Sequence, residues 1–271
     1  MKYKLILLLP ILLLLNCESN SVTPHIKNYE MVEADDSNLS DSLKNVFLDD
    51  AYRIALNNYL SFDSTNVDSI KIPNNLVNKY YNGLIHIFNE KDFSEIDSIM
   101  NIYSIHTWVN PELRAFNLYV DSSAIWIYKW LGAYSYVTGY NKLDSLMENY
   151  RISILRIQNI TWLEEVKYNV EMFTKDRLNI RALMKLFNKL HGITWAEPRS
   201  YGGDGNNIYI EDSGDKLIFT FRLAWGDCPS GCTSAHYWSF EVNYVGEVTF
   251  ISSVGSSLKN YIKWPPNQQI N

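Results

Sequence analysis

Residues 215–250 read DKLIFTFRLAWGDCPSGCTSAHYWSFEVNYVGEVTF, and this stretch decides the fold of the chain. In-phase residues recur at every second position in three runs, and mostly polar residues lie between them. Such alternation is typical of an antiparallel sheet with one covered face and one face in water. Gly214-Asp215, before the first run, and Gly246, between the second and third, provide turns. The covered face is predicted to comprise Leu217, Phe219, Phe221, Leu223, Trp225, His236, Trp238, Phe240, Val242, Val248 and Phe250.

Upstream of this meander the hydrophobic period is mainly helical. Apolar residues recur every three or four positions, the spacing of one helical face, and short alternating runs interrupt them. We expect helices over 40–60, 73–88, 94–103, 121–139, 141–149 and 178–191, and strands over 113–120, 150–157 and 166–173. The sequence therefore predicts an α+β fold, with a mostly helical N-terminal part containing a few strands and a C-terminal antiparallel β-meander.

The first residues of the chain are typical of an export signal. Lys2 and Lys4 precede Leu5–Leu15, a run of eleven apolar residues. A bilayer-spanning helix needs about 20 apolar residues, so this run is too short to cross. A basic start followed by a short apolar run marks a secretory signal. No Ala-x-Ala site follows the run, which ends at a lone cysteine, Cys17.

This segment resembles a bacterial lipoprotein signal with the lipobox Leu14-Leu15-Asn16-Cys17. The resemblance implies a lipid on the Cys17 thiol and a second attachment on its new amino group after cleavage. Asn16 departs from the small residue that usually precedes this cysteine. An ordinary cleaved signal and an uncleaved anchor remain alternatives.

The domain organisation follows from this address and from composition. We expect a signal peptide over 1–16, a flexible tether over 17–40, one α+β domain over 41–255 with an optional subdivision near 195–205, and a tail over 256–271. The tether assignment rests on the polar composition of 18–40, which buries too little apolar surface to offset its ordering entropy.

Charge argues against a polyanion partner. The chain carries 24 basic and 30 acidic residues, a net charge of −6, and loss of residues 1–16 removes two lysines and no acid, which gives −8. Nucleic-acid binding needs a positive footprint, so none is expected. The predicted location is the cell envelope, anchored by lipid to a membrane on its periplasmic or outer-membrane surface.

Two cysteines within the meander favour a local disulfide. Pro229 and Gly231 suit a β-turn that reverses the chain between Cys228 and Cys232. Exported proteins meet an oxidising compartment, and a lipidated Cys17 leaves these as the remaining thiols. We therefore expect Cys228 and Cys232 to be bonded. Two alternatives assign chemistry to these residues. One is a metal site formed by Cys228, Cys232, His236 and Asp227, and the other is a nucleophile pair of Cys228 and His236.

Other candidate sites have ordinary structural explanations. Gly202–Asn207 lacks the ligand pattern of a calcium loop and reads as a turn before a strand. Among the aromatic residues, Trp225 and Trp238 are in phase with the core, whereas Trp195 and Tyr237 are free to stack on a sugar or a peptide. The adjacent acids Glu164-Glu165, Asp49-Asp50 and Asp35-Asp36 have side chains that diverge, so they form no catalytic pair on their own. His86 and His106 are isolated in the sequence. No cofactor motif is present, so no cofactor is expected.

The motif Gly226-Asp-Cys-Pro-Ser-Gly-Cys232, followed by His236-Tyr-Trp238, resembles a signature of uncharacterised bacterial lipoproteins of a flavobacterial type. That resemblance covers most of residues 48–255 and implies no activity and no catalytic residue. It supports a structural role for the cysteine turn.

Two functional hypotheses follow. The first is a non-enzymatic, membrane-anchored envelope lipoprotein that binds an envelope protein, a peptide or a glycan. The second is an envelope hydrolase acting on cell-wall or polysaccharide material, whose carboxylates converge only in the fold. Two carboxyl groups about 5–9.5 Å apart in an open site would favour the second.

Overall fold

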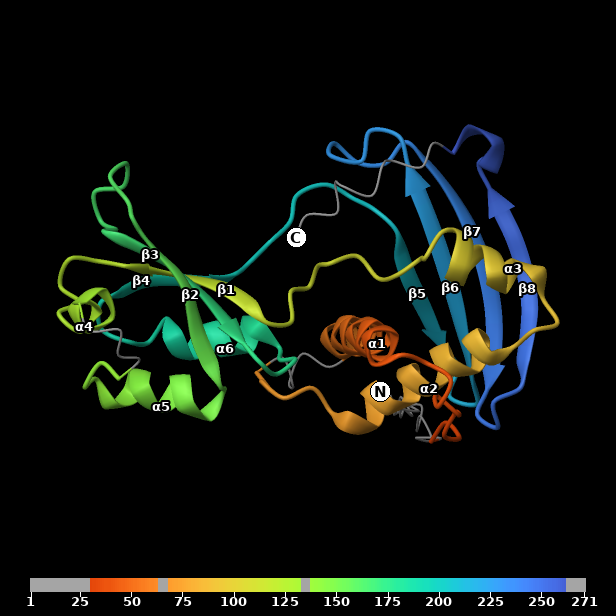
Figure 1. Cartoon of the computed structure of the whole chain (residues 1–271), viewed down its shortest axis with the longest axis horizontal. Helices are drawn as coiled ribbons and strands as arrows, with labels where there is room; N and C mark the ends of the chain where they lie inside the picture. The colour runs from red at the N-terminus through yellow and green to blue at the C-terminus, as the bar shows by residue number, and fades with distance from the viewer. Residues whose placement is uncertain (1–29, 63–67, 133–136, 262–271) are drawn as a thin grey trace, which may run out of the picture.

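The computed structural model describes residues 30–62, 68–132 and 137–261, which form two lobes, each with one four-stranded antiparallel sheet (Figure 1). We name the sheets A and B and the lobes after them. Lobe A contains β1 (Ala115–Val120), α4 (Ile127–Gly132), α5 (Asn141–Asn149), β2 (Ile152–Asn159), β3 (Tyr168–Thr174), α6 (Ile180–Phe187) and β4 (Ile193–Pro198). Lobe B contains α1 (Asp41–Phe62), α2 (Asn74–Asn89), α3 (Ser94–Asp97), the π-helical turn η1 (Ser98–Ile102), β5 (Asn207–Asp212), β6 (Lys216–Trp225), β7 (Ser234–Asn243), β8 (Val248–Gly255) and the 3₁₀ turn η2 (Leu258–Asn260).

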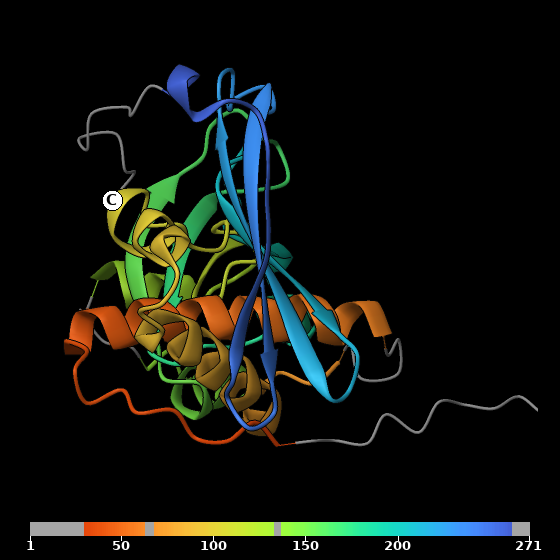
Figure 2. The same ribbon diagram turned by 90° about the vertical axis from the view of Figure 1, so that its right-hand side faces the viewer.

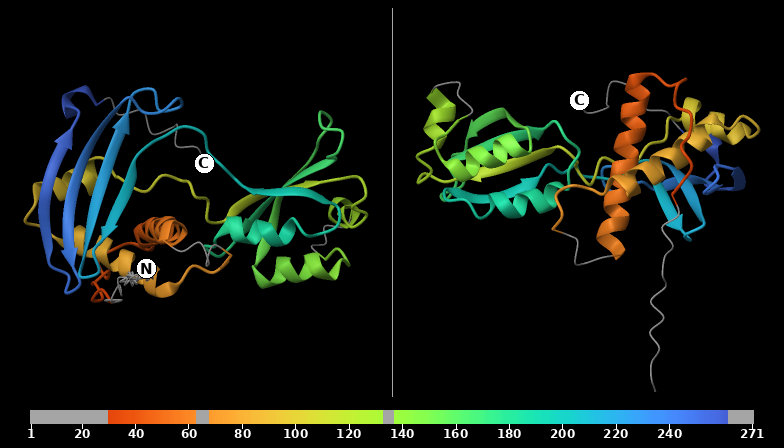
Figure 3. Two further views of the ribbon diagram at one scale, coloured as in Figure 1. Left: turned by 180° about the vertical axis from the view of Figure 1, so that it is seen from behind. Right: turned by 90° about the horizontal axis from the view of Figure 1, so that it is seen from below.

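Sheet B has the strand order β5-β6-β7-β8; its last three strands are the predicted meander, and β5 adds a fourth strand beside β6. Phe219 of β6 pairs with Phe240 of β7, and both are fully buried. Helices α2 and α3 lie on one side of this sheet (Figure 2), and the view from behind shows its other side in front of them (Figure 3, left). The alternation therefore confirms the expected arrangement: the apolar side of the sheet packs on helices and the polar side is left open.

Sheet A has the strand order β2-β3-β1-β4, so strands distant in sequence lie side by side. Its apolar face packs against α5 and α6, which lie below it in Figure 1. Strand β4 was not predicted. It begins just after Gly192, whose φ of +84° is the left-handed conformation that ends a helix, and whose missing side chain admits the Ala124 Cβ.

The predicted α+β fold is confirmed. The chain crosses between the two lobes more than once, which the prediction did not include. The chain leaves lobe B near 104–114, builds lobe A, and returns over 199–206 (Figure 3, right). The return coincides with the subdivision suggested near 195–205. The outward crossing was not anticipated, because lobe B is assembled from two separate parts of the chain.

Two expected boundaries need correction. Met31, Ala34 and Leu39 are buried in the core of lobe B, so residues 30–40 belong to the folded part and not to the tether expected over 17–40. Three spaced apolar residues suffice to dock this segment although it has no regular period. Likewise Leu258 and Tyr261 pack against the lobe B core, so residues 256–261 belong to the folded part and not to the tail expected over 256–271. The expected signal over 1–16, Cys17, residues 18–29 and residues 262–271 lie outside the described residues.

Candidate functional site

The open face of sheet A gathers aromatic and polar side chains in two rows across its four strands. Residues opposite one another in register share a face of a sheet. One row runs through Gln158, Asn169, Tyr119 and Trp195. The next runs through Arg156, Glu171, Asn117 and Glu197. All eight are exposed or half-buried, whereas their neighbours on the other face, such as Leu118 and Val170, are fully buried.

Tyr119 and Trp195 form the centre of this face. Their rings stack with centroids 4.1 Å apart and planes 22° from parallel. Trp195 lies on β4, an edge strand, so no further strand flanks the other face of its indole. The Tyr119 hydroxyl donates to Glu197 Oε1 at 2.9 Å. Burial, this hydrogen bond and the charges of nearby acids raise the pKa of Tyr119 to about 12, so the phenol stays protonated. We call Tyr119, Trp195 and Glu197 the platform.

Polar groups extend from the platform along the second row. Arg156 donates to Glu171 Oε1, and its Nε lies 3.1 Å from that oxygen. Asn117 lies between Glu171 and Glu197 in register. Asn169 Oδ1 is buried and accepts no hydrogen bond from any described residue. The face therefore offers amide and carboxylate groups beside an aromatic stack.

A pocket of about 320 Å³ adjoins the platform at the boundary between the lobes. Glu197 belongs to both, because it is also one of the residues that line this pocket. The polar residues of the lining are Asn110, Glu112, Arg181, Glu197, Arg199 and Ser200. We call it the interlobe pocket.

Cys228 and Cys232 are bonded to each other, as the sequence predicted. The turn that they close packs on residues 203–205. The Asp204 N–H donates to Cys228 O at 2.9 Å. Gly203 has a φ of +87°, and a Cβ there would come within 2.7 Å of the same oxygen. Only glycine fits so close to the disulfide turn.

Arg222 of β6 holds residues 204–205 of this loop through hydrogen bonds. Its guanidinium makes two hydrogen bonds to the Asp204 carboxylate, at 2.7 and 2.6 Å, and one to Gly205 O at 2.8 Å. The hydrogen bond from Arg222 is the main cause that lowers the pKa of Asp204 to about 2. The same pair raises the pKa of Arg222. Both groups are therefore charged throughout the range in which proteins work.

The structure separates the two aromatic residues expected to bind a ligand. Trp195 is on sheet A, whereas Tyr237 is on the open face of sheet B, opposite Arg222 in register. Tyr237 lines an open pocket of about 500 Å³ with Arg222 and Cys232. Trp225 and Trp238 are buried, as predicted. The four aromatic residues thus form no single site.

The alternatives that need free cysteines do not form, since both sulfur atoms are engaged in the disulfide. Half-buried His236 lies 2.9 Å from Ser256 O through Nδ1 and 2.8 Å from Ser253 Oγ through Nε2. Across the described parts of the chain, no group of three or more His, Cys, Asp or Glu side chains is placed to hold a metal ion.

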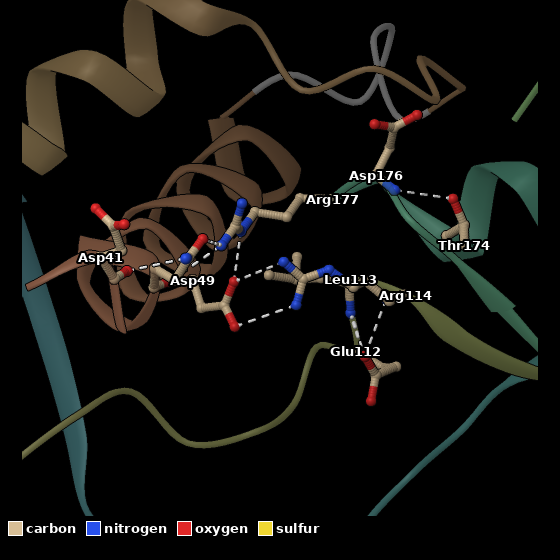
Figure 4. Close-up of polar contacts among 9 residues, drawn as sticks. Asp41, Asp49, Glu112, Leu113, Arg114, Thr174, Asp176 and Arg177 are labelled. Atoms are coloured by element: carbon tan, nitrogen blue, oxygen red, sulfur yellow. Dashed lines mark hydrogen bonds and ion pairs between the residues drawn. The ribbon is translucent and has the colours of Figure 1, made fainter. Parts of the chain in front are cut away.

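Two adjacent acids diverge, as expected, but both enter networks that the sequence did not reveal. Asp50 is 1% exposed, and its Oδ2 lies 2.7 Å from Nδ1 of His106, which was expected to be isolated. Its Oδ1 accepts from both the backbone and the hydroxyl of Thr107. Asp49 instead turns toward lobe A and pairs with Arg114 and Arg177 (Figure 4). Asp49 thereby ties α1 to lobe A.

A pocket of about 650 Å³ lies between residues 30–36 and the helices α1 and α2. Asp36 accepts hydrogen bonds from Lys44 at 2.9 Å and Tyr81 at 2.7 Å. The bond from Lys44, followed by that from Tyr81, lowers the pKa of Asp36. These charged groups satisfy one another and fix the 30–40 segment, so the pocket has a structural explanation.

No family model, curated protein or solved structure matches this chain. Within the described ranges, no helix combines the length and the apolar composition that a membrane crossing requires.

Sequence reasoning singled out Trp195 but missed its partners. Tyr119 and Glu197 both lie two residues from a neighbour on the same face, Asn117 and Trp195 respectively. Residues of one face recur at every second position along β1, whereas in β4 this spacing is found only between Trp195 and Glu197. The pairing of β1 with β4 is what joins them, and it spans more than seventy residues of sequence.

Proposed function

We propose that this chain is a non-enzymatic binding protein of the bacterial cell envelope, anchored to a membrane through lipid on Cys17, and that its ligand is a glycan held on the platform. The address is supported by the basic start, the short apolar run and the lone cysteine after it. A triacylated cysteine has the two or more chains that stable anchoring requires.

The stack of Tyr119 and Trp195 is the observation that carries the choice of ligand. The apolar face of a sugar ring packs against an aromatic ring, and its hydroxyl groups bond to carboxylates and amides. The platform places Glu197 beside the stack, and Asn117 follows in the same row. The outer side of the Trp195 indole lies at a sheet edge, where a sugar has access. A peptide or an envelope protein as ligand would be an outcome of the same test.

The test is binding of the full chain, purified in detergent, to a panel of envelope and extracellular polysaccharides by affinity electrophoresis. We expect retardation by at least one polysaccharide and its loss in Trp195→Ala. Trp162→Ala is the matched control, because Trp162 is a 76% exposed tryptophan between β2 and β3 of the same lobe. Absence of binding across the panel, or binding by Trp195→Ala equal to that of the unchanged protein, would refute the glycan proposal.

The anchor is tested separately by intact mass and fractionation. We expect an acyl mass on Cys17 in protein isolated from the producing cells, and membrane association that Cys17→Ser abolishes. A protein without acyl groups, or a Cys17→Ser variant that stays with the membrane, would contradict lipid anchoring.

A second candidate is the envelope hydrolase, and the spacing of two carboxylates favours it. Glu171 and Glu197 face the same side on strands separated by β1. Two strand spacings place their Cα atoms about 9–10 Å apart, close to the separation of the acid and base in inverting glycosidases. Release of reducing ends from a bound polysaccharide, lost in both Glu171→Gln and Glu197→Gln, would establish hydrolysis in place of simple binding.

A further inference from the structure

The platform and the interlobe pocket share Glu197, so one extended ligand that follows β4 can contact both. Trp195 and Arg199 are four residues apart, which is about 13 Å in extended chain. Glu197 lies between them and contributes to the platform and to the pocket lining. A short oligosaccharide that stacks on Trp195 and follows β4 therefore ends beside Arg199.

The acidic groups of the pocket are already engaged. Glu197 accepts the hydrogen bond of Tyr119. Glu112 Oε1 accepts the backbone N–H groups of Leu113 and Arg114, at 2.8 and 2.9 Å. One oxygen of each carboxylate is therefore occupied by donors of the protein itself.

The cationic groups have no such partners. Neither Arg181 nor Arg199 forms an ion pair with a carboxylate among the described residues. The Arg199 guanidinium lies 5.5 Å from the centre of the Tyr201 ring. Arg53, one turn of α1 before the pocket-lining Leu56, has a buried Nε without an acceptor in the described part of the chain.

We infer that the interlobe pocket binds a carboxylate of the ligand, and that the glycan is therefore acidic, a polymer containing uronic acid or a similar carboxylated sugar. This inference rests on the proposed function. A guanidinium presents parallel N–H groups that match the two oxygens of a carboxylate. The net charge of −6 does not oppose it, because charges farther than about 8 Å away are largely screened at physiological ionic strength.

The decisive experiment compares each acidic polysaccharide of the panel, such as alginate, pectate and hyaluronate, with its own carboxyl-reduced form. We expect the full chain to bind at least one acidic form and to lose about 10-fold or more in affinity for the reduced form, as the loss of charge-assisted hydrogen bonds predicts. The Arg181→Ala/Arg199→Ala double variant should show the same loss for the acidic form. Its affinity for the reduced form should equal that of the unchanged protein.

Lys185→Ala is the matched control, because Lys185 is a cation on the same helix, four residues from Arg181, and pairs with Asp68 outside the pocket. It should bind as the unchanged protein does. Equal binding of acidic and reduced forms, with loss of both in Trp195→Ala, would overturn the carboxylate inference and leave the glycan proposal standing. Equal binding of sulfated dextran would indicate attraction to any polyanion and would also overturn it. No binding to any polysaccharide would refute the proposed function itself.

Discussion

Arg222 and Asp204 form a two-pronged ion pair that fixes the disulfide turn to sheet B. Both guanidinium Nη atoms bond to the carboxylate, and the Asp204 N–H bonds to Cys228 O. The Arg222 side chain is 11% exposed and that of Asp204 37% exposed. Loss of Asp204 would leave a largely buried cation without its counterion, which costs more than the pair itself contributes.

Asp204→Asn is expected to lower the free energy of unfolding by about 2 kcal/mol. This is less than the cost of breaking a fully buried ion pair, because the Asp204 side chain is more than a third exposed. The measurement is urea unfolding at pH 7. Asp215→Asn, in the exposed turn before β6, is the control and should change the free energy by less than about 0.5 kcal/mol. Equal losses in the two variants would show that the pair is not specifically stabilising.

The same pair predicts how stability depends on acid. The hydrogen bond from Arg222 holds the pKa of Asp204 at about 2, below the value of 3.8 for an unperturbed aspartate. A carboxylate with a lowered folded-state pKa contributes its full stabilisation above the unfolded pKa and loses it as the pH falls. The stability difference between the unchanged protein and Asp204→Asn should therefore shrink between pH 4 and pH 2. A difference that stays constant over that interval would contradict this linkage.

The disulfide closes a loop of five residues, and the chain-entropy relation gives such a loop about 2 kcal/mol. Cys228→Ser/Cys232→Ser should therefore lower the free energy of unfolding by about this amount while leaving the far-ultraviolet circular dichroism unchanged. Addition of reductant to the unchanged protein should reproduce the loss and should have no effect on the double variant. Stability that does not respond to reductant would show that the bridge is dispensable.

Asp50 is expected to matter more for stability than its neighbour Asp49. Asp50→Ala leaves the backbone and hydroxyl of buried Thr107 without their acceptor, at a cost of about 3 kcal/mol. Asp49→Ala should cost less, about 2 kcal/mol, because the Asp49 side chain is 26% exposed whereas that of Asp50 is 1% exposed. Thermal or urea unfolding of the two single variants compares them directly. Equal effects would indicate that the Asp50 network is no stronger than the interlobe pair.

The contrast between the two sheets explains how much of the fold could be predicted. In sheet B each strand pairs with the next along the chain, so local alternation and turn residues determine the register. In sheet A, β1 lies between β3 and β4, and no local signal specifies these long-range pairings. Strand β4 buries Ile193 and Ala196, which are three residues apart, and it ends at Pro198, so it carries no clear alternation of buried and exposed residues.

The candidate site was partly predictable for the same reason. Trp195 stood out because it is an aromatic residue outside any apolar period. Its stacking on Tyr119, and the Tyr119 bond to Glu197, exist only once β1 and β4 pair. His106 was isolated in sequence, and Asp50 reaches it from a helix 56 residues earlier. Contacts between residues far apart in the sequence could not be predicted from local hydrophobic periodicity.

Tyr119→Phe tests whether the hydroxyl bond to Glu197 matters for binding. The substitution keeps an aromatic ring against Trp195 and removes the donor that holds the Glu197 carboxylate. We expect glycan affinity to fall several-fold, equivalent to about 1 kcal/mol for one hydrogen bond, and stability to change by no more than that. Trp195→Ala removes the stacking surface itself and should cause the larger loss. Isothermal titration with the polysaccharide fragment that the panel identifies would measure both.

Because the Tyr119 pKa is raised to about 12, affinity should not respond to deprotonation of this phenol up to pH 10. A Tyr119→Phe variant that binds as tightly as the unchanged protein would show that the carboxylate needs no fixing, and that the ring stack alone holds the sugar.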